Sequence, residues 1–387
     1  MNDPGKTSIP PPLPLLTRLR FVQHQTTLLI VLIAITIAAF FLTRSLAAAN
    51  RALHRSDAAR WHAIGKQRLA ERDATGAVAA LRRAATRHRD SRDIQLSLAE
   101  AFSAAGDSGN ARDVLLKIRQ RFPDDPEVNL RLATLEAGSG HTDEAIRNYQ
   151  TALLGLWGSE QLAQRRQLRS EYIEFLLDRA LPQRALSESL LLAGEIPDDL
   201  PSHLRVGDLL LRAGDPARAL QQFESALDVA PSDPEALARA GEAAFEAGSF
   251  RLAHKYLSAA PDRPRSRTLR PVVELIAALD PLMPGLATRE RHRRVATATD
   301  RLAVEVERCR VTACATAGSR CTSIEGLAKE TATTRAKLAR RGRRGESVDA
   351  GLSIVVALAE RASAACGANP PIIRAVALIA ARHGVGR

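Results

Sequence analysis

The chain repeats a pattern about every 34 residues, most clearly in the segments 92–125, 126–159 and 200–233. Small residues recur at the eighth and twentieth places of this pattern, and residues that suit helix packing recur at the twenty-fourth and twenty-seventh. The eighth place holds Ala99, Ala133 and Gly207, and the twentieth holds Ala111, Ala145 and Ala219. The twenty-fourth place holds Leu115, Tyr149 and Phe223, and the twenty-seventh holds Ile118, Ala152 and Ala226. Small residues let two helices approach closely, and the larger ones fill the space between neighbouring pairs. The repeat therefore predicts a stack of similar helical units.

Glycine and proline lie at fixed places in the repeat. Glycines stand near its middle at Gly106, Gly140, Gly214 and Gly248, and prolines near its end at Pro123, Pro197 and Pro231. Glycine can adopt the left-handed conformation that ends a helix, and proline cannot continue one. No stretch alternates apolar and polar residues as a half-buried strand requires, and aromatic residues make up only 4% of the chain. We therefore expect antiparallel helix pairs and an all-α fold.

These features resemble the tetratricopeptide repeat. The first copy has Trp61, Ile64 and Gly65 at the tryptophan, leucine and glycine places of that family, followed by Ala77, Leu81 and Ala84. The resemblance implies a right-handed superhelix of helical hairpins with a concave groove that binds protein. We place about six repeats within residues 58–262, at 58–91, 92–125, 126–159, 166–199, 200–233 and 234–262.

The sequence departs from the family pattern in a few places. Arg89 and Trp157 stand where proline is expected, and Ile173 occupies the small eighth place of the fourth repeat. The residues 160–165 are additional, and they break the register between the third and fourth repeats. We therefore expect the superhelix to be irregular near this segment.

An uncharged, apolar segment precedes the repeats. It begins at Thr26 and ends at Thr43, with the sequence TTLLIVLIAITIAAFFLT, and a helix of that length just covers the hydrocarbon core of a membrane. We predict a transmembrane helix at 26–47, a disordered proline-rich tail at 1–25 and a juxtamembrane linker at 48–57. A cleaved signal peptide is the alternative, because residues 47–49 are all alanine, but the proline-rich leader and Arg44 fit it poorly.

The net charge of +12 is located at the C-terminal end of the chain. Residues 263–387 contain 23 Lys or Arg against 11 Asp or Glu, while the rest of the chain is balanced. We expect this basic region to be helical, with helices at 272–280, 289–310, 323–341 and 347–365, and with its first helices capping the last hairpin. The densest basic run, 340–345, is either a solvated linker or a contact for anionic lipid or nucleic acid. It lacks the interleaved aromatic residues that stack on bases.

All four cysteines lie in the basic region. Cys309, Cys314, Cys321 and Cys366 are compatible with free buried thiols or with two disulfides in an oxidising compartment. Their spacing lacks the tight pairs that a zinc site requires, so no metal is expected.

The family resemblance implies which side chains line the groove. We expect them at Glu100, Leu130, Glu174, Asp178, Leu204, Asp208, Leu211, Arg212, Glu242, Phe245 and Glu246. This set is mainly acidic, so the expected protein partner offers a basic or amphipathic segment, with Leu204, Leu211 and Phe245 as apolar contacts. There are two alternatives: the groove is merely solvated, or the basic C-terminal region closes it.

No phosphate-binding loop, HExxH sequence, nucleophile elbow or calcium loop is present, so we expect no enzyme and no cofactor. The layout resembles single-span bacterial repeat proteins. We expect a membrane-anchored scaffold or adaptor for the assembly of an envelope or membrane complex, with its bulk outside the cytoplasm and no nucleic-acid partner. The alternative is a regulatory adaptor that faces the cytoplasm and uses its basic region to contact nucleic acid or anionic lipid.

Overall fold

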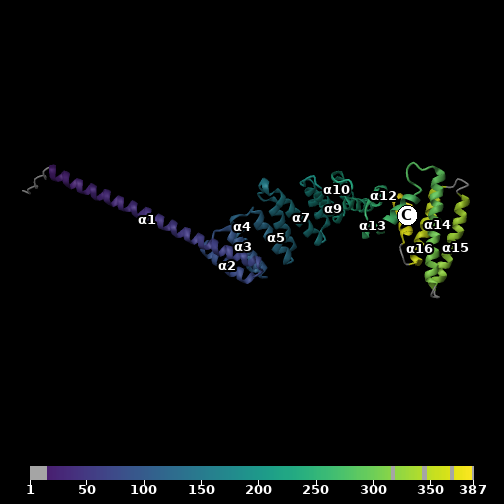
Figure 1. Ribbon diagram of the computed structural model, residues 1–387, viewed down its shortest axis with the longest axis horizontal. Helices are drawn as coiled ribbons and strands as arrows, with labels where there is room; N and C mark the ends of the chain where they lie inside the picture. The colour runs from purple at the N-terminus through teal and green to yellow at the C-terminus, as the bar shows by residue number, and fades with distance from the viewer. Residues whose placement is uncertain (1–14, 315–318, 342–346, 367–369, 386–387) are drawn as a thin grey trace, which may run out of the picture. The chain divides into compact units, whose positions relative to one another are not determined.

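The computed structural model describes residues 15–314, 319–341, 347–366 and 370–385. The described residues form helices and connecting turns and contain no strand, so the fold is all-α, as expected (Figure 1). The chain divides into two compact units, residues 1–157 and 158–387. The division falls beside the segment 160–165, where the sequence predicts an interruption of the repeats.

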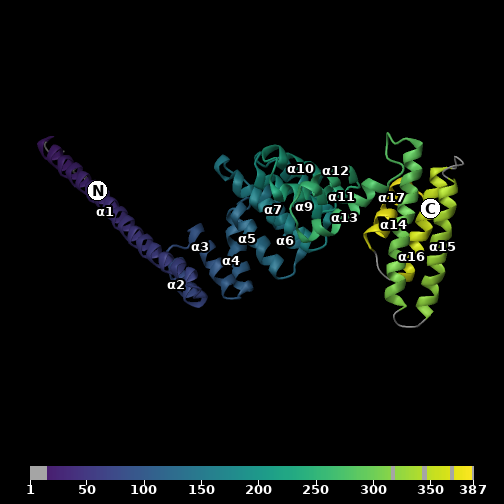
Figure 2. The ribbon, with the colours of Figure 1, turned by 45° about the vertical axis from the view of Figure 1, so that its right-hand side comes forward.

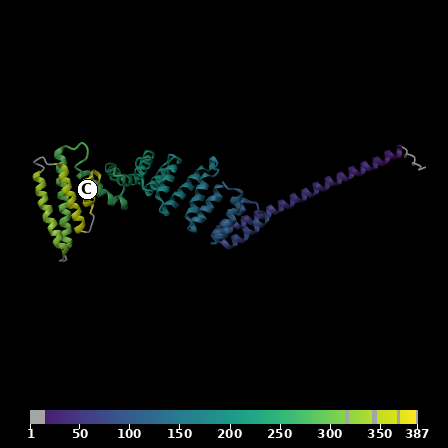
Figure 3. The same ribbon diagram turned by 180° about the vertical axis from the view of Figure 1, so that it is seen from behind.

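From residue 15 onward, the first unit contains one long helix and five short ones. They are α1 (Leu15–Ala70), α2 (Ala74–Arg87), α3 (Arg92–Ala104), α4 (Ser108–Arg121), α5 (Pro126–Gly138) and α6 (Thr142–Leu154). The end of α1 pairs with α2, and the next four helices form two further hairpins, which Figure 3 shows from behind. The helix α1 begins before the expected start at residue 26 and runs without a break through 48–57. Residues 1–14 lie outside the described part of the chain.

In its described residues, the second unit begins with the short 3-10 helix η1 (Ser159–Gln161) and contains eleven α-helices. The hairpin helices are α7 (Leu162–Asp178), α8 (Pro182–Ala193), α9 (Leu200–Arg212), α10 (Pro216–Val229), α11 (Pro234–Glu246) and α12 (Phe250–Ala259). The remaining helices are α13 (Pro264–Leu279), α14 (Thr288–Ala313), α15 (Ser319–Arg341), α16 (Val348–Cys366) and α17 (Pro371–His383). The long helices α14, α15 and α16 contact one another and form a bundle (Figure 2).

The repeated small and apolar residues form the contacts within the hairpins. All twelve residues that the sequence places at the four recurring positions are buried. Gly207 of α9 is so close to α10 that a Cβ atom on it would lie 2.5 Å from Cε1 of Phe223. The same two places bring Gly65 against Leu81, where a Cβ would lie 2.4 Å from Cγ. The residue at the eighth place is therefore small because the side chain at the twenty-fourth place fills the space beside it.

The turn inside each hairpin has the same backbone conformation in all six repeats. Gly106, Gly140, Gly214 and Gly248 have φ angles of 77°, 81°, 90° and 72°, as the sequence predicts. In the first and fourth repeats the equivalent residues are Arg72, with φ 62°, and Ala180, with φ 54°. A side chain in this left-handed region is unfavourable, so packing of the two helices must hold these turns.

The irregular segment is a change in how the fourth hairpin begins. The indole of Trp157 donates a hydrogen bond to the carbonyl of Ala152 at 3.0 Å and closes the third hairpin. The additional residues form η1 and lengthen α7 at its start. Ile173 is fully buried at its eighth place.

The basic region is helical, but its first helix differs from the expectation. That helix, α13, begins at Pro264 rather than at 272 and passes through Pro271. Proline there removes one backbone hydrogen bond. Leu269, Val272 and Ile276 are nevertheless buried, so the helix is held by its packing. The final helix, α17, returns to contact α13, and the sequence did not predict it.

Candidate partner-binding groove

The first helices of successive hairpins in the second unit lie next to one another. Together with α13, the helices α7, α9 and α11 line an open pocket of about 480 Å³. Its lining consists of Glu174, Arg205, Asp208, Leu209, Leu211, Arg212, Arg239, Glu246 and Arg265. The structure thus brings several of the expected groove residues into one pocket, together with arginines that were not expected.

Arginines on the first helix of a hairpin pair with acids on the first helix of the preceding hairpin. Arg212 of α9 lies 3.4 Å from Glu174 and 3.8 Å from Asp178, both on α7. Arg239 of α11 lies 3.4 Å from Asp208 of α9. These pairs form a ladder of alternating charge across the hairpins.

The ladder ends on α13. Arg265 lies 3.7 Å from Glu242 of α11 and also pairs with Glu246. Because α13 follows the last repeat, its arginine could not be assigned to the groove from the repeat positions alone. It supplies positive charge beside Glu242 and Glu246, two of the acids expected in the groove.

The first unit contains the same kind of pair. Arg131 of α5 donates to Glu100 of α3 at 3.1 Å, and Leu130 beside it is half-buried. Arg131, Arg205 and Arg239 all stand at the sixth place of their repeats, which is not among the family positions used to predict the groove. The recurrence of arginine at this place could have revealed the pairs of Arg131 and Arg239, whereas Arg205 donates to Gln167 and Arg212 stands at the thirteenth place, where the groove was expected.

Burial differs sharply along the ladder. The side chain of Glu242 is 5% exposed, while those of Glu174, Asp178 and Arg265 are 57%, 75% and 55% exposed. Burial raises the pKa of Glu242, and the positive charge of Arg265 opposes that shift. Burial also raises the pKa of Asp208, against the effect of Arg239. The groove therefore presents acids at its α7 end and a guanidinium at its α13 end.

The expected apolar contacts are only partly accessible. Leu204 and Leu211 are half-buried. Phe245 is buried, with its ring edge-to-face on Phe250 at 5.7 Å and beneath the guanidinium of Arg374 at 5.1 Å. Because Arg374 belongs to α17, the C-terminal helix covers the apolar residue that was expected to lie open.

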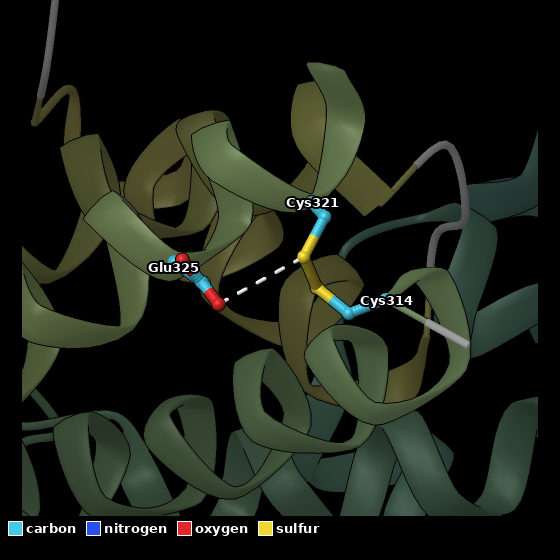
Figure 4. A group of neighbouring side chains, drawn as sticks. All are labelled: Cys314, Cys321 and Glu325. Atoms are coloured by element: carbon cyan, nitrogen blue, oxygen red, sulfur yellow. Dashed lines mark hydrogen bonds between the residues drawn. A yellow bond between two sulfur atoms is a disulfide. The ribbon is translucent and has the colours of Figure 1, made fainter. Parts of the chain in front are cut away.

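The four cysteines form two disulfides in the C-terminal bundle. Cys309 bonds to Cys366, and Cys314 bonds to Cys321. The ligand atoms of Cys314, Cys321 and Glu325 lie within 4.8 Å of one another, and Figure 4 shows the sulfurs joined beside the carboxylate. Thiolate is the form of cysteine that binds a metal ion, so the bonded pair offers no metal ligand.

One helix in the described part of the chain, α1, is long and apolar enough to cross a membrane. Residues 27–53 are all exposed, so no part of the described protein covers them. By length and composition the same segment also fits a signal sequence.

Comparison with known proteins decides the nature of the hairpins. A family model described as tetratricopeptide repeat matches residues 68–135 and 210–269. These segments are tetratricopeptide repeats. Repeats of this kind stack into extended surfaces that bind other proteins, which supports an interaction scaffold. No curated protein sequence matches the chain.

Several solved tetratricopeptide repeat structures are similar in fold. YrrB, described as having an unusual peptide-binding site, is 16% identical over 47% of this chain and 91% of that one, with a TM-score of 0.36. A repeat protein from Parabacteroides merdae is 12% identical over 62% and 91%, with a TM-score of 0.37. PilW, a type IV pilus biogenesis factor, is 14% identical over 52% and 90%, with a TM-score of 0.36. These similarities concern the helical fold alone.

Proposed function

We propose that the chain is a membrane-anchored scaffold that binds an extended segment of a partner protein in the groove formed by α7, α9, α11 and α13. The observation that carries this proposal is the pocket between these helices, where charged side chains line a hollow of about 480 Å³. Concave surfaces built by first helices are the usual binding surfaces of stacked repeats. The complex assembled on it belongs to the membrane or the envelope.

The distribution of exposed charge indicates the chemistry of the partner. Glu174 and Asp178 are the more exposed members of their ion pairs with Arg212 at the α7 end, at 57% and 75% against 47%. At the α13 end, Arg265 is exposed while its partner Glu242 is buried. A partner segment with basic residues near α7 and acidic residues near α13 would pair with Glu174, Asp178 and Arg265, while Glu242 stays buried. Of the basic or amphipathic segments that the sequence favours, we propose one of mixed charge.

The cysteines support a position outside the cytoplasm for the bulk of the chain. All four are paired within one bundle. Disulfides persist in oxidising compartments and are rare in the cytoplasm. With α1 as an uncleaved anchor, the N-terminus then lies inside and the repeats outside.

The cytoplasmic adaptor is less well supported. Several arginines of the basic region are paired with acids of the same region, including Arg308 with Glu305 and Arg361 with Glu330, each at 2.7 Å. The run 340–345 ends α15 and continues outside the described residues. A reporter fused after Arg387 that is active only in the cytoplasm would favour the adaptor.

Charge reversal tests groove binding. The variant with Glu174→Lys and Asp178→Lys should lose its partner in co-purification from native membranes, because basic residues of the segment would meet lysine. Asp228→Lys changes an exposed acid on α10, away from the pocket, and should retain the partner. Equal recovery of every protein by both variants and the wild type would count against groove binding.

A further inference from the structure

The membrane-spanning helix continues into water as an exposed stalk. About 15 residues separate Thr43 from Ala58, the first residue after Thr43 in α1 that is buried against the repeats, which corresponds to about 22 Å. Within this stalk Leu46 is 70% exposed and Leu53 is 68% exposed. Leu53 lies about 15 Å beyond Thr43 along the helix axis, too far for the hydrocarbon core to cover it.

These two leucines belong to a regular apolar seam. Their spacing of seven residues continues backward through α1 in alternating steps of three and four. The seam consists of Leu28, Leu32, Ile35, Ala39, Leu42, Leu46, Ala49 and Leu53. Leu28 to Leu42 lie in the apolar segment, where any register of the helix is apolar, so the stalk residues Leu46, Ala49 and Leu53 are the members that define the seam.

Three of the four charged residues in the stalk lie away from the seam, while Asp57 lies about 30° from its centre and pairs with Arg87 of α2 at 3.1 Å. Arg44, Arg51 and Arg55 are exposed and lie on one side of the helix, because their spacings of seven and four residues return to nearly the same direction. At about 100° per residue, that side is roughly half a turn from Leu46 and Leu53. The seam positions themselves therefore carry no charge, while the opposite side carries all three arginines.

The seam also points away from the repeats. The stalk face that packs on the first hairpin is centred on Ala58 and Gly65, both buried. This face lies about 130° around the helix from the seam. A second helix could lie along the seam without displacing the repeats of its own chain. Ser56 occupies the next seam position and Arg60 the one after it, so the apolar pattern ends at Leu53.

We infer that this seam is a dimer interface, and that its occupant is α1 of a second copy of the chain. Two copies inserted in one membrane with the same orientation have parallel helices, so identical residues meet, Leu46 with Leu46 and Leu53 with Leu53. Leucine and alanine at these positions pair with themselves, and the arginines on the outer side do not face one another. The inference rests on the membrane anchor of the proposed function and adds that the scaffold presents two parallel repeat arrays.

Single-cysteine cross-linking of the full chain in native membranes tests the seam. Leu46→Cys and Leu53→Cys should give a disulfide-linked product of twice the chain mass after mild oxidation. Ala48→Cys and Ala59→Cys, exposed on other sides of the same helix, are matched controls and should give much less. The unaltered chain is the blank, because its own cysteines are already paired.

Each outcome decides for or against the seam. Equal cross-linking at all four positions would indicate random collision and overturn the inference, as would no product at any of them. A product of another mass would show that a different protein occupies the seam. Leu53→Glu changes an exposed residue and should reduce the dimer fraction by at least several-fold, measured by mass photometry in detergent.

Failure of the membrane anchor is measured separately. If alkaline carbonate extracts the chain from membranes, α1 is not a membrane anchor, and that part of the proposed function is wrong. Cross-linking could then still be measured on the released chain. A chain that stays in the membrane but gives no seam-specific product would overturn the dimer alone.

Discussion

Asp280 and His383 are 103 residues apart in the chain, and Nε2 of His383 lies 3.1 Å from both carboxylate oxygens of Asp280. Asp280 directly follows α13 and is completely buried, while His383 is the last residue of α17. The amide of Leu282 also donates to Asp280 at 2.9 Å, and Arg382 lies 3.8 Å away. Since a buried carboxylate needs such partners, these contacts fix the C-terminal helix on the end of the repeats.

Removing the histidine should loosen α17. His383→Ala leaves the buried carboxylate with fewer donors, so we expect a loss of about 1–3 kcal/mol in the free energy of unfolding. Amide protons of α17 should exchange faster, as measured by hydrogen exchange with mass spectrometry. His254→Ala, at a half-buried histidine of α12, serves as the control and should leave exchange in α17 unchanged. Unaltered exchange in His383→Ala would contradict the role of this contact.

The left-handed turn of the fourth repeat offers a stabilising substitution. Ala180 has φ 54°, where glycine stands in four other repeats. Ala180→Gly should raise the free energy of unfolding by about 1 kcal/mol, because glycine has no Cβ to strain. Ala105→Gly, at φ −81°, should instead lower it, since it only adds freedom to the unfolded chain. Urea unfolding of both variants compares them, and a loss of stability in Ala180→Gly would refute the strain.

The sequence predicted the hairpins well because each depends on local, repeated features. The small eighth place and the glycine turn are visible as a period, and the structure has them where expected. Arg72 and Ala180 adopt the same left-handed turn without glycine, so that conformation is imposed by the packing of the flanking helices. A period alone therefore locates the turn more reliably than its residue type does.

The charge of the groove could not be read from single positions. Glu242 and Asp208 are acidic in the sequence, but Arg239 and Arg265 from neighbouring helices lie against them. Such pairs depend on which helices become neighbours. The contact between α13 and α17 is of the same kind, because it joins segments far apart in the chain.

The close contact between α9 and α10 predicts a sensitive glycine. Gly207→Ala would place a Cβ 2.5 Å from the fully buried ring of Phe223, which has no room to move. We expect a loss of about 1–3 kcal/mol from overpacking. Gly326→Ala, inside α15 with nothing within 4 Å of the added atom, should be neutral or stabilising. Differential scanning fluorimetry gives the ranking, and equal midpoints for the two variants would disprove the tight contact.

The two disulfides should contribute unequally. Cys309 and Cys366 are 57 residues apart, while Cys314 and Cys321 are 7 apart. Restriction of the unfolded chain grows with the closed loop, so the Cys309→Ser, Cys366→Ser pair should cost about 4 kcal/mol and the Cys314→Ser, Cys321→Ser pair about 2 kcal/mol. Urea unfolding without reductant measures both. The reverse order would show that loop length does not govern these bonds.

The buried acid of the groove should make stability depend on pH. Burial raises the pKa of Glu242 above the 4.5 of a free side chain. A carboxyl with a raised pKa in the folded state stabilises the fold most below its unfolded pKa, and this contribution is lost as the pH rises through the folded pKa. Glu242→Gln cannot titrate. The wild type should therefore lose stability relative to Glu242→Gln as the pH rises from about 4 to 7.

Urea unfolding of the two proteins at each pH gives this difference directly. Other titrating groups are common to both, so their effects cancel unless they couple to Glu242. Glu235→Gln changes a more exposed acid of the same helix, with 44% of its side chain accessible, and serves as the control. A wild type that gains stability relative to Glu242→Gln as the pH rises would mean that Arg265 and Arg239 outweigh burial. The ion pairs with Arg265 and Arg239 would then stabilise the charged form of Glu242 by more than burial destabilises it.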